Sequence, residues 1–266
     1  MTPQDCANAA ADLIEAEASG HQIGLLSLRH PEMGIDDAYA VQTEIIKRKV
    51  EQGRRIIGWK IGLTSKAMQA ALGIDFPDSG VLFDDMIFAT GSTVPKERFI
   101  QPRVEAEIAF GISKAISNEA NREEILDATA WVAPALEILD TRIFRRDPES
   151  GTPRGIVDTI SDNAANAGIV LGQERHALDA IDLRWVGAIT FRDGTVEETG
   201  LGAGVLNDPV ESVVWLAQRM ASYGQRIEGG HVILSGSFIR PVECPSGAQI
   251  HADFGTFGTV AVTFEK

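Results

Sequence analysis

The sequence has few of the residues on which several common protein classes depend. Only two of its 266 residues are cysteines, and these, Cys6 and Cys244, lie near opposite ends of the chain. Neither has the spacing of a disulfide framework, a zinc site or a redox motif. None of the five histidines falls in a zinc-type spacing either. We therefore interpret both cysteines as packing residues and do not expect a zinc enzyme.

Positive charge and long hydrophobic runs are also scarce. The chain has 24 Lys and Arg against 38 Asp and Glu, which gives a formal net charge of −14. Such a negative balance repels the phosphates of nucleic acids and anionic membrane surfaces. No window approaches the roughly 18 apolar residues that a transmembrane helix needs, and the first 20 residues do not resemble a signal peptide. We expect a cytoplasmic protein with no nucleic-acid or membrane partner.

The secondary structure expected from the sequence is mostly β. Two N-terminal helices are predicted, one from about Pro3 to Ala18 and one with Asp36 as its N-cap and Gly53 as its stop. A later helix should begin at Asp208, with proline at its first position. Short β-branched or alternating segments predict strands over 81–88, 104–110, 135–140, 167–171, 185–191, 231–234, 250–254 and 259–264.

This order of elements lacks the βαβ rhythm of a parallel α/β protein. It predicts an α+β fold, in which a central mixed β-sheet rolls into a barrel-like core with peripheral helices. We expect a helical N-terminal region, residues 1–55, to pack on a catalytic β-roll core, residues 56–266, as one functional unit. Gly200–Gly204 lacks the spacing of a dinucleotide-binding motif, and Ser235–Ser237 lacks that of a nucleophile elbow.

The segment Arg103–Phe110 places two glutamates where strands rarely carry them. Alternate residues of a strand share a face, so Glu105 and Glu107 should point to the same side, roughly 6.7 Å apart along the strand. Two like charges there repel each other unless a cation lies between them. The alternative is a solvated sheet face with two ordinary surface glutamates.

A third glutamate, Glu137, lies in the apolar segment Val132–Asp140. A lone ionised carboxylate is expensive to bury without a partner, which an arginine such as Arg142 could supply. Three carboxylates with no histidine or cysteine nearby instead match a hard cation, Mg²⁺ or Mn²⁺, in octahedral oxygen coordination. The sequence therefore offers Glu105, Glu107 and Glu137 as candidate metal ligands.

Several ordered segments carry a family resemblance. They are Gly58–Ser65, Pro77–Asp78, Arg103–Glu107, Leu136–Asp140 and Ser161–Ala164. Together they resemble the hydratase/decarboxylase family of aromatic meta-cleavage pathways, which belongs to the fumarylacetoacetate hydrolase superfamily. The similarity extends from about Asp36 to Phe264. It implies a Mg²⁺-dependent enzyme that forms a large homo-oligomer.

Two further segments, Asp158–Gly168 and Gly236–Pro241, resemble the family members that act on a seven-carbon 2-oxo dicarboxylate. The resemblance implies addition of water to 2-oxohept-4-ene-1,7-dioate, or its 2-hydroxydiene tautomer, to give 4-hydroxy-2-oxoheptanedioate. Decarboxylation of 4-oxalocrotonate and hydration of 2-hydroxypentadienoate are the alternatives within the family. A non-catalytic partner subunit of the same fold is the alternative outside catalysis.

The resemblance also implies two proton-handling residues. Lys60 is the candidate to bind the enol oxygen or carboxylate and to move a proton, and Asp78 is the candidate base. Ser161 is the candidate hydroxyl donor to a substrate oxygen. The structural alternatives are a solvated lysine, an aspartate in a turn and a serine that caps a helix.

The distal carboxylate of a dicarboxylate substrate needs a cation of its own. The resemblance implies Arg154 and Arg240 as the candidates, since both lie in segments similar to those of the enzymes that act on the seven-carbon dicarboxylate. A guanidinium suits the task because it can bind a carboxylate through two hydrogen bonds. Either arginine could instead pair with a nearby acid such as Glu243 or Asp158.

Overall fold

The computed structural model describes residues 1–66, 69–70 and 74–266. Its helices are α1 (Pro3–Ser19), α2 (Leu26–Arg29), α3 (Ile35–Glu51), α5 (Arg122–Ala128), α6 (Ile156–Ser161) and α7 (Pro209–Ala221). Its strands are β1 (Ile56–Gly62), β2 (Asp78–Phe83), β3 (Ile87–Ala89), β4 (Thr93–Val94), β5 (Arg103–Ile112), β6 (Thr129–Leu139), β7 (Asn166–Leu171), β8 (Gly187–Arg192), β9 (Thr195–Leu201), β10 (Val232–Leu234), β11 (Val242–Glu243), β12 (Gln249–Asp253) and β13 (Thr259–Phe264). In the described part of the chain, no helix is both long enough and apolar enough to cross a membrane.

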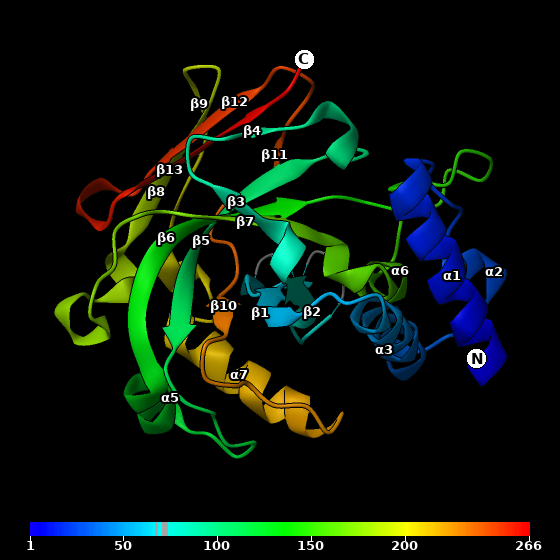
Figure 1. Ribbon diagram of the computed structural model, residues 1–266, viewed down its shortest axis with the longest axis horizontal. Coiled ribbons are helices and arrows are strands. Elements are labelled where there is room, and N and C mark those ends of the chain that lie inside the picture. The colour runs from blue at the N-terminus through cyan, green and yellow to red at the C-terminus, as the bar shows by residue number, and fades with distance from the viewer. Residues whose placement is uncertain (67–68, 71–73) are drawn as a thin grey trace.

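The strands form two sheets. The larger has the order β2-β1-β10-β5-β6-β7-β3, with β11 added alongside β5, and the smaller has the order β4-β13-β12-β8-β9. The pairs β1–β10 and β3–β7 are parallel, whereas β5 pairs with both β6 and β10 in antiparallel fashion. This mixture confirms the predicted α+β class with a mixed sheet. Figure 1 shows β5 and β6 as strongly curved strands, with α1, α2, α3 and α6 gathered on one flank.

The two faces of the larger sheet differ in character. On one face of β5, side chains such as Val104, Ile108 and Phe110 belong to the main hydrophobic core. Side chains of the smaller sheet and of α7 complete this core. The other face of β5 carries Glu105 and Glu107, and there Ala109 and Ala135 belong to a smaller hydrophobic cluster with Leu82, Ile169 and Leu234. The two-residue period of a strand thus separates the core from the chemistry.

The N-terminal helices bury a hydrophobic cluster of their own. Buried side chains of α1 and α3, including Leu13 and Ile45, pack with Ile143 and with Ile160 of α6. The division into residues 1–55 and residues 56–266 stays a prediction.

Several expected boundaries were wrong. The strand predicted over 81–88 is interrupted by a 3₁₀ turn, Asp84–Met86, because the carboxylate of Asp84 accepts hydrogen bonds from the backbone and side chain of Arg55. The second helix begins after Gly34 rather than Asp36, because the carboxylate of Asp37 accepts the Gly34 N–H at 2.9 Å.

The C-terminal helix begins as predicted. Asp208 is the N-cap of α7, and its carboxylate accepts the N–H of Val210 at 3.0 Å. The strand expected over 185–191 starts later, as β8, because Leu183–Trp185 forms a 3₁₀ turn. The elements that were not predicted from the sequence are β1, β4, β9, β11, α2, α5 and α6.

Candidate active site

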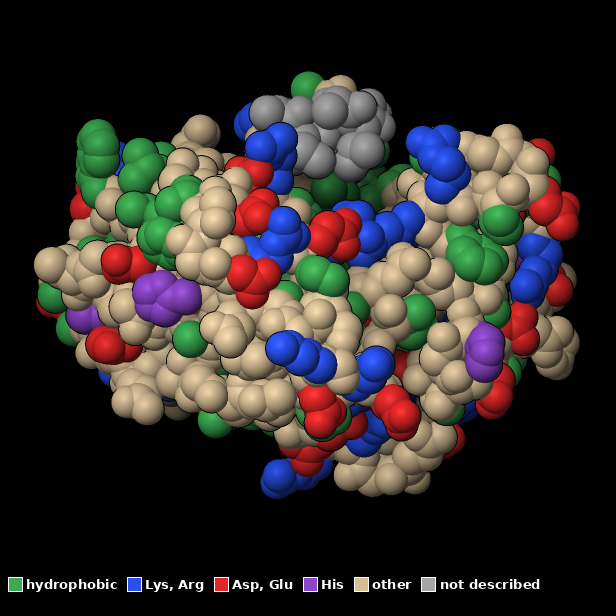
Figure 2. Space-filling model, turned by 90° about the horizontal axis from the view of Figure 1, so that it is seen from above, with side chains coloured by type: hydrophobic (Ala, Val, Ile, Leu, Met, Phe, Trp, Pro, Cys, Tyr) green, Lys and Arg blue, Asp and Glu red, His purple; other side chains and the backbone are tan. Residues whose placement is uncertain are grey.

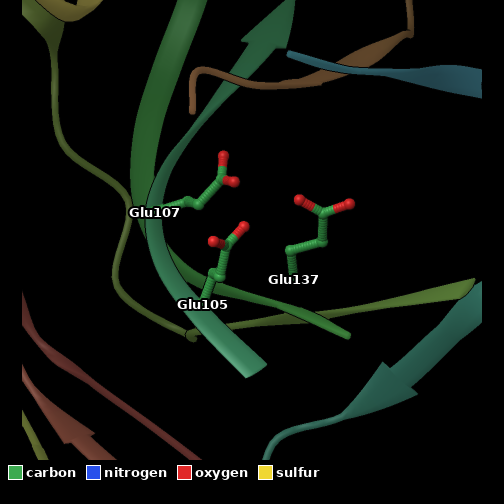
Figure 3. Close-up of side chains that lie close together, drawn as sticks. All are labelled: Glu105, Glu107 and Glu137. Atoms are coloured by element: carbon green, nitrogen blue, oxygen red, sulfur yellow. The ribbon is translucent and has the colours of Figure 1, made fainter. Parts of the chain in front are cut away.

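Three glutamates converge on the face of the larger sheet opposite the main core. Glu105 of β5 lies directly across from Glu137 of β6, and Glu107 follows two residues along β5. One carboxylate oxygen from each lies within 4.8 Å of the others. Figure 3 shows the three carboxylates pointing toward one another. Glu107 and Glu137 have no exposed surface, so the alternative of solvated surface glutamates is wrong for them.

The carboxylates have few hydrogen-bond partners for such buried groups. Within the described residues, Oε1 of Glu107 and both carboxylate oxygens of Glu137 have none. The other oxygen of Glu107 accepts the N–H of Gly236 at 2.7 Å. Arg142, the alternative partner for Glu137, instead binds Asp162, with its Nε 2.5 Å from Oδ1. Buried carboxylate oxygens without hydrogen-bond partners are the donor set that a hard divalent cation requires.

The surroundings make these carboxylates difficult to ionise without a cation. Burial, and then the neighbouring Glu137, raise the pKa of Glu105 to about 8. The same two causes raise the pKa of Glu107 well above its usual value. Burial also raises the pKa of Glu137, although the Lys60 ammonium acts in the opposite direction. A bound cation would relieve this repulsion.

Lys60 reaches the carboxylates from β1. Its Nζ lies 3.5 Å from Oε1 of Glu137 and 4.0 Å from Oδ1 of Asp78, and its side chain is only 4% exposed. Burial alone would lower the pKa of the ammonium, but the carboxylates of Glu137 and Asp78 raise it above its usual value. Lys60 is therefore a buried cation, and the alternative of a solvated lysine is wrong.

The curvature of the sheet makes this contact possible. Lys60 and Glu137 lie on β1 and β6, which are separated by β10 and β5. At about 4.8 Å per strand, a flat sheet would hold these backbones roughly 14 Å apart. The strong curvature seen in Figure 1 and the length of both side chains bring the charged groups together.

Asp78 begins strand β2 rather than occupying a turn. It pairs with Gly62 of β1, and its buried Oδ1 has no hydrogen-bond partner among the described residues. A side chain at position 62 would place its Cβ 2.2 Å from that oxygen, so any residue other than glycine would displace the Asp78 carboxylate. Burial raises the pKa of Asp78, and the charges of Lys60 and Arg154 act against that increase.

A cavity of about 460 Å³ opens beside these groups. Its lining includes five of the predicted site residues, namely Lys60, Asp78, Glu105, Arg154 and Arg240. Figure 2 shows basic and acidic side chains side by side across the middle of the upper face. The structure thus brings together charges from five separate segments of the chain.

Ser161 does not line this cavity. It is the last residue of α6, its side chain is fully buried, and its hydroxyl has no hydrogen-bond partner among the described residues. Gly155 is the N-cap of that helix, so Ser161 does not cap its start. Its predicted contact with substrate stays a prediction.

The wall next to Ser161 contains an unusual backbone. Three successive residues other than glycine, Asn163, Ala164 and Ala165, have left-handed φ values of 52°, 52° and 59°. Each such residue costs roughly 1–2 kcal/mol. The side chain of Asn163 holds the turn by exchanging two hydrogen bonds with the backbone of Val81, at 2.8 and 3.0 Å. Ala164 and Ala165 line the cavity, so this turn shapes its wall.

Two site residues were missed from the sequence. Gly236, which binds Glu107, has φ of +110°, and a Cβ there would lie 2.4 Å from Oγ1 of Thr64. The weak signal was its place in the segment Gly236–Pro241. Glu198 also lines the cavity, but it lies on β9, a strand that the sequence did not predict.

Comparison with known proteins yields close relatives over the full length. A 2-oxo-hept-4-ene-1,7-dioate hydratase from Escherichia coli is 48% identical over 96% of this chain and 96% of its own length. A 2-keto-4-pentenoate hydratase from Paraburkholderia xenovorans is 40% identical, over 100% of this chain and 97% of its own. No family model matches the chain.

Solved structures also resemble this chain over most of its length. The 4-oxalocrotonate decarboxylase of Pseudomonas putida G7, complexed with magnesium and adipate, has a TM-score of 0.91 at 31% identity and covers 99% of this chain and 98% of its own. A fumarylpyruvate hydrolase from Pseudomonas aeruginosa, at 14% identity and a TM-score of 0.59 over 80% of this chain and 89% of its own, shares the fold. The chain therefore belongs to the hydratase/decarboxylase family of meta-cleavage pathways, within the fumarylacetoacetate hydrolase superfamily.

Proposed function

We propose that the protein is a Mg²⁺-dependent hydro-lyase of aromatic catabolism. Its substrate would be 2-oxohept-4-ene-1,7-dioate or the 2-hydroxydiene tautomer, and its product 4-hydroxy-2-oxoheptanedioate. The observation that carries the proposal is the convergence of three glutamates within 4.8 Å beside a buried lysine and aspartate. The 48% identical hydratase from Escherichia coli supports the choice of reaction.

Glu105, Glu107 and Glu137 would hold the cation. Their buried oxygens without hydrogen-bond partners, and the absence of histidine or cysteine from this cluster, suit Mg²⁺ or Mn²⁺. When bound, such an ion supplies a positive charge that polarises the 2-oxo group and stabilises the negative charge of an enolate. The decarboxylase of Pseudomonas putida G7, whose structure contains magnesium, supports this assignment.

Lys60 and Asp78 would handle the protons. The ammonium of Lys60 can donate a hydrogen bond to a substrate oxygen, because it faces the cavity as a buried cation. Asp78, whose Oδ1 lies 4.0 Å from Lys60 Nζ, can accept a proton from water or from the substrate carbon chain. Its raised pKa brings it closer to the range in which a general base works at neutral pH.

The cavity suits a small dicarboxylate. A volume of about 460 Å³ is typical of small-molecule sites, and three arginines, Arg103, Arg154 and Arg240, contribute to its lining. Arg154 and Arg240 are the candidates to bind the distal carboxylate. Ser161 would need to move, or to act through a neighbour, in order to reach a substrate oxygen.

Decarboxylation of 4-oxalocrotonate is the second candidate function. The TM-score of 0.91 to a 4-oxalocrotonate decarboxylase favours it. Both reactions use the same groups, because each needs a stabilised negative charge next to a 2-oxo acid. The choice between them therefore depends on how water and the leaving carboxylate are placed.

A substrate panel tests the proposal. Purified protein with Mg²⁺ is offered the seven-carbon dioate, 2-hydroxypentadienoate and 4-oxalocrotonate, while loss of diene absorbance and release of CO₂ are recorded. We expect hydration with the highest kcat/KM on the seven-carbon dioate, and loss of activity in EDTA that Mg²⁺ restores. Release of CO₂ as the main reaction would favour the decarboxylase. No turnover of any substrate in the presence of Mg²⁺ would favour a non-catalytic partner subunit.

Three other features stay predictions. They are the cytoplasmic location, assembly into a large homo-oligomer, and the division into a helical N-terminal region and a catalytic core. Size-exclusion chromatography with light scattering would give the subunit number.

A further inference from the structure

Three arginines line the cavity, and their surroundings differ. A dicarboxylate substrate brings a second negative charge, which needs a cation that no carboxylate of the protein already neutralises. Arg103, Arg154 and Arg240 can therefore be ranked by their own partners. The ranking separates one arginine from the other two.

Arg240 and Arg103 are already paired with carboxylates. Nη2 of Arg240 lies 2.6 Å from Oε1 of Glu198, and the arginine side chain is 78% exposed. Nε of Arg103 donates to Oε1 of Glu243 at 2.6 Å. Binding a substrate carboxylate at either one would mean breaking or sharing an existing ion pair.

Arg154 lies deeper, and the ion pair that it makes, with Asp162, is a long one. Its side chain is 17% exposed, and its Nη1 donates to the hydroxyl of Thr141 at 2.6 Å. The nearest carboxylate, Asp162, is 4.0 Å away and is already held by Arg142, through its Nε at 2.5 Å and its backbone N–H at 2.9 Å. Among the described residues, no carboxylate accepts a hydrogen bond from Arg154.

The orientation of Arg154 is also fixed. Thr141, which accepts its hydrogen bond, donates in turn to the carbonyl of Ile143. A guanidinium has five N–H groups, so most of those on Arg154 stay free to bind an anion. Burial lowers the pKa of Arg154, and Arg142, Arg145 and Arg103 add to that effect while Asp162 opposes it. The three neighbouring arginines would each attract an anion bound to Arg154.

We infer that Arg154, rather than Arg240, binds the substrate carboxylate that lies farther from the three glutamates. The inference deepens the proposed function and rests on it, because it assumes that a dicarboxylate occupies this cavity. Arg240 and Glu198 then form a neutral pair at the cavity wall that takes no direct part in recognition.

Steady-state kinetics on two variants separate the two arginines. Arg154→Met and Arg240→Met are compared on the seven-carbon dioate and on 2-hydroxypentadienoate, which has a single carboxylate. For Arg154→Met we expect KM for the dioate to rise about 10-fold or more, as for a lost charge-assisted hydrogen bond, with KM for the monocarboxylate changing less than about 3-fold. For Arg240→Met we expect the ratio of the two KM values to stay near that of the wild type.

Two controls support this comparison. Arg184→Met removes an exposed arginine that pairs with Asp182 outside the cavity, and it should leave both KM values unchanged. Arg154→Lys keeps the charge but loses the planar fork, so its dioate KM should fall between those of the wild type and Arg154→Met. It also provides a milder variant if Arg154→Met does not fold.

A binding measurement keeps the inference testable apart from turnover. Adipate and hexanoate are titrated by calorimetry into the Mg²⁺-loaded wild type and Arg154→Lys. We expect the lysine variant to lose adipate affinity and to keep hexanoate affinity.

A dioate-specific loss in Arg240→Met, or equal losses on both ligands at Arg154, would overturn the inference. A wild type that binds adipate through Arg154 but hydrates no substrate would instead contradict the proposed function alone.

Discussion

Two groups of buried charged side chains are organised in opposite ways. The carboxylate cluster, Glu105, Glu107 and Glu137, gathers like charges around several oxygens that have no hydrogen-bond partner. In the arginine cluster, formed by Arg142 and Asp162, one cation meets one anion. Arg142 also donates to the backbone carbonyls of Asp162 and Asn166, at 2.7 and 3.3 Å.

This difference in charge pairing indicates a structural role for the arginine cluster and a ligand-binding role for the carboxylate cluster. A buried ion pair with satisfied hydrogen bonds holds the chain in place, and removing one partner strands the other charge. A buried group of like charges destabilises the empty protein and gains stability when a ligand binds. We therefore expect mutations in the two clusters to shift stability in opposite directions.

Breaking the arginine cluster should have the largest effect. Arg142→Met leaves Asp162 buried without its cation, so the free energy of unfolding should fall by about 3–5 kcal/mol. Urea unfolding followed by circular dichroism measures this. The exposed pair of Arg184 and Asp182 is a matched control, whose loss should cost less than about 1 kcal/mol. Similar small losses in both variants would show that the buried pair has no special structural role.

Lys60 lies at the edge of the carboxylate cluster, and its removal should affect chemistry more than metal binding. Lys60→Ala should lower kcat on the order of 10²-fold while the affinity for Mg²⁺ changes little, because Lys60 moves a proton rather than binding the cation. Asp78→Asn should behave similarly if Asp78 is the base. A wild-type kcat at saturating Mg²⁺, combined with a changed metal affinity, would assign Lys60 an electrostatic role only.

Gln42 of α3 links the helical flank to the site, and its loss should have an intermediate effect. Its Nε2 donates to the carbonyl of Ser79 at 2.9 Å and to that of Ile160 at 3.0 Å, next to Asp78 and Ser161 respectively. Gln42→Leu should lower the free energy of unfolding by about 1–3 kcal/mol, because both buried carbonyls lose their donor. The exposed Gln52→Leu on the same flank serves as the control. Equal melting temperatures for the two variants would contradict this role.

The metal-free protein should show a dependence of stability on pH. The pKa of Glu105 is raised from 4.5 to about 8 in the folded state, so the folded protein binds more protons than the unfolded chain between these values. Stability should therefore decline as pH rises from about 4.5 to about 8. Saturating Mg²⁺ should abolish the decline, which thermal unfolding across this pH range would detect. A metal-free stability that rises with pH would contradict the repulsion.

The sequence predicted the carboxylate cluster better than its surroundings. The two-residue period of β5 was enough to place Glu105 and Glu107 on one face, and the apolar context of Glu137 indicated that it is buried. Local patterns also placed α7, because Asp208 followed by proline is a strong helix start. These features depend on neighbours within a few residues.

Features that depend on contacts between distant segments could not be predicted. The pairing of Lys60 with Glu137 needs the curvature of a sheet whose strand order cannot be read from the sequence. Arg240 pairs with Glu198 rather than with Glu243, because β9 lies beside the segment that carries the arginine. Asp158, the other expected acid, instead accepts hydrogen bonds from Ser27.

Titration of the metal-free protein with Mn²⁺ tests directly whether the three glutamates form one cation site. The free ion is followed by electron paramagnetic resonance in the wild type, in Glu107→Gln and in Glu123→Gln, which changes an exposed glutamate on α5. We expect one tightly bound Mn²⁺ per chain in the wild type and in Glu123→Gln, displaced by Mg²⁺, and none in Glu107→Gln. Equal binding in all three proteins, or no binding in the wild type, would contradict the site.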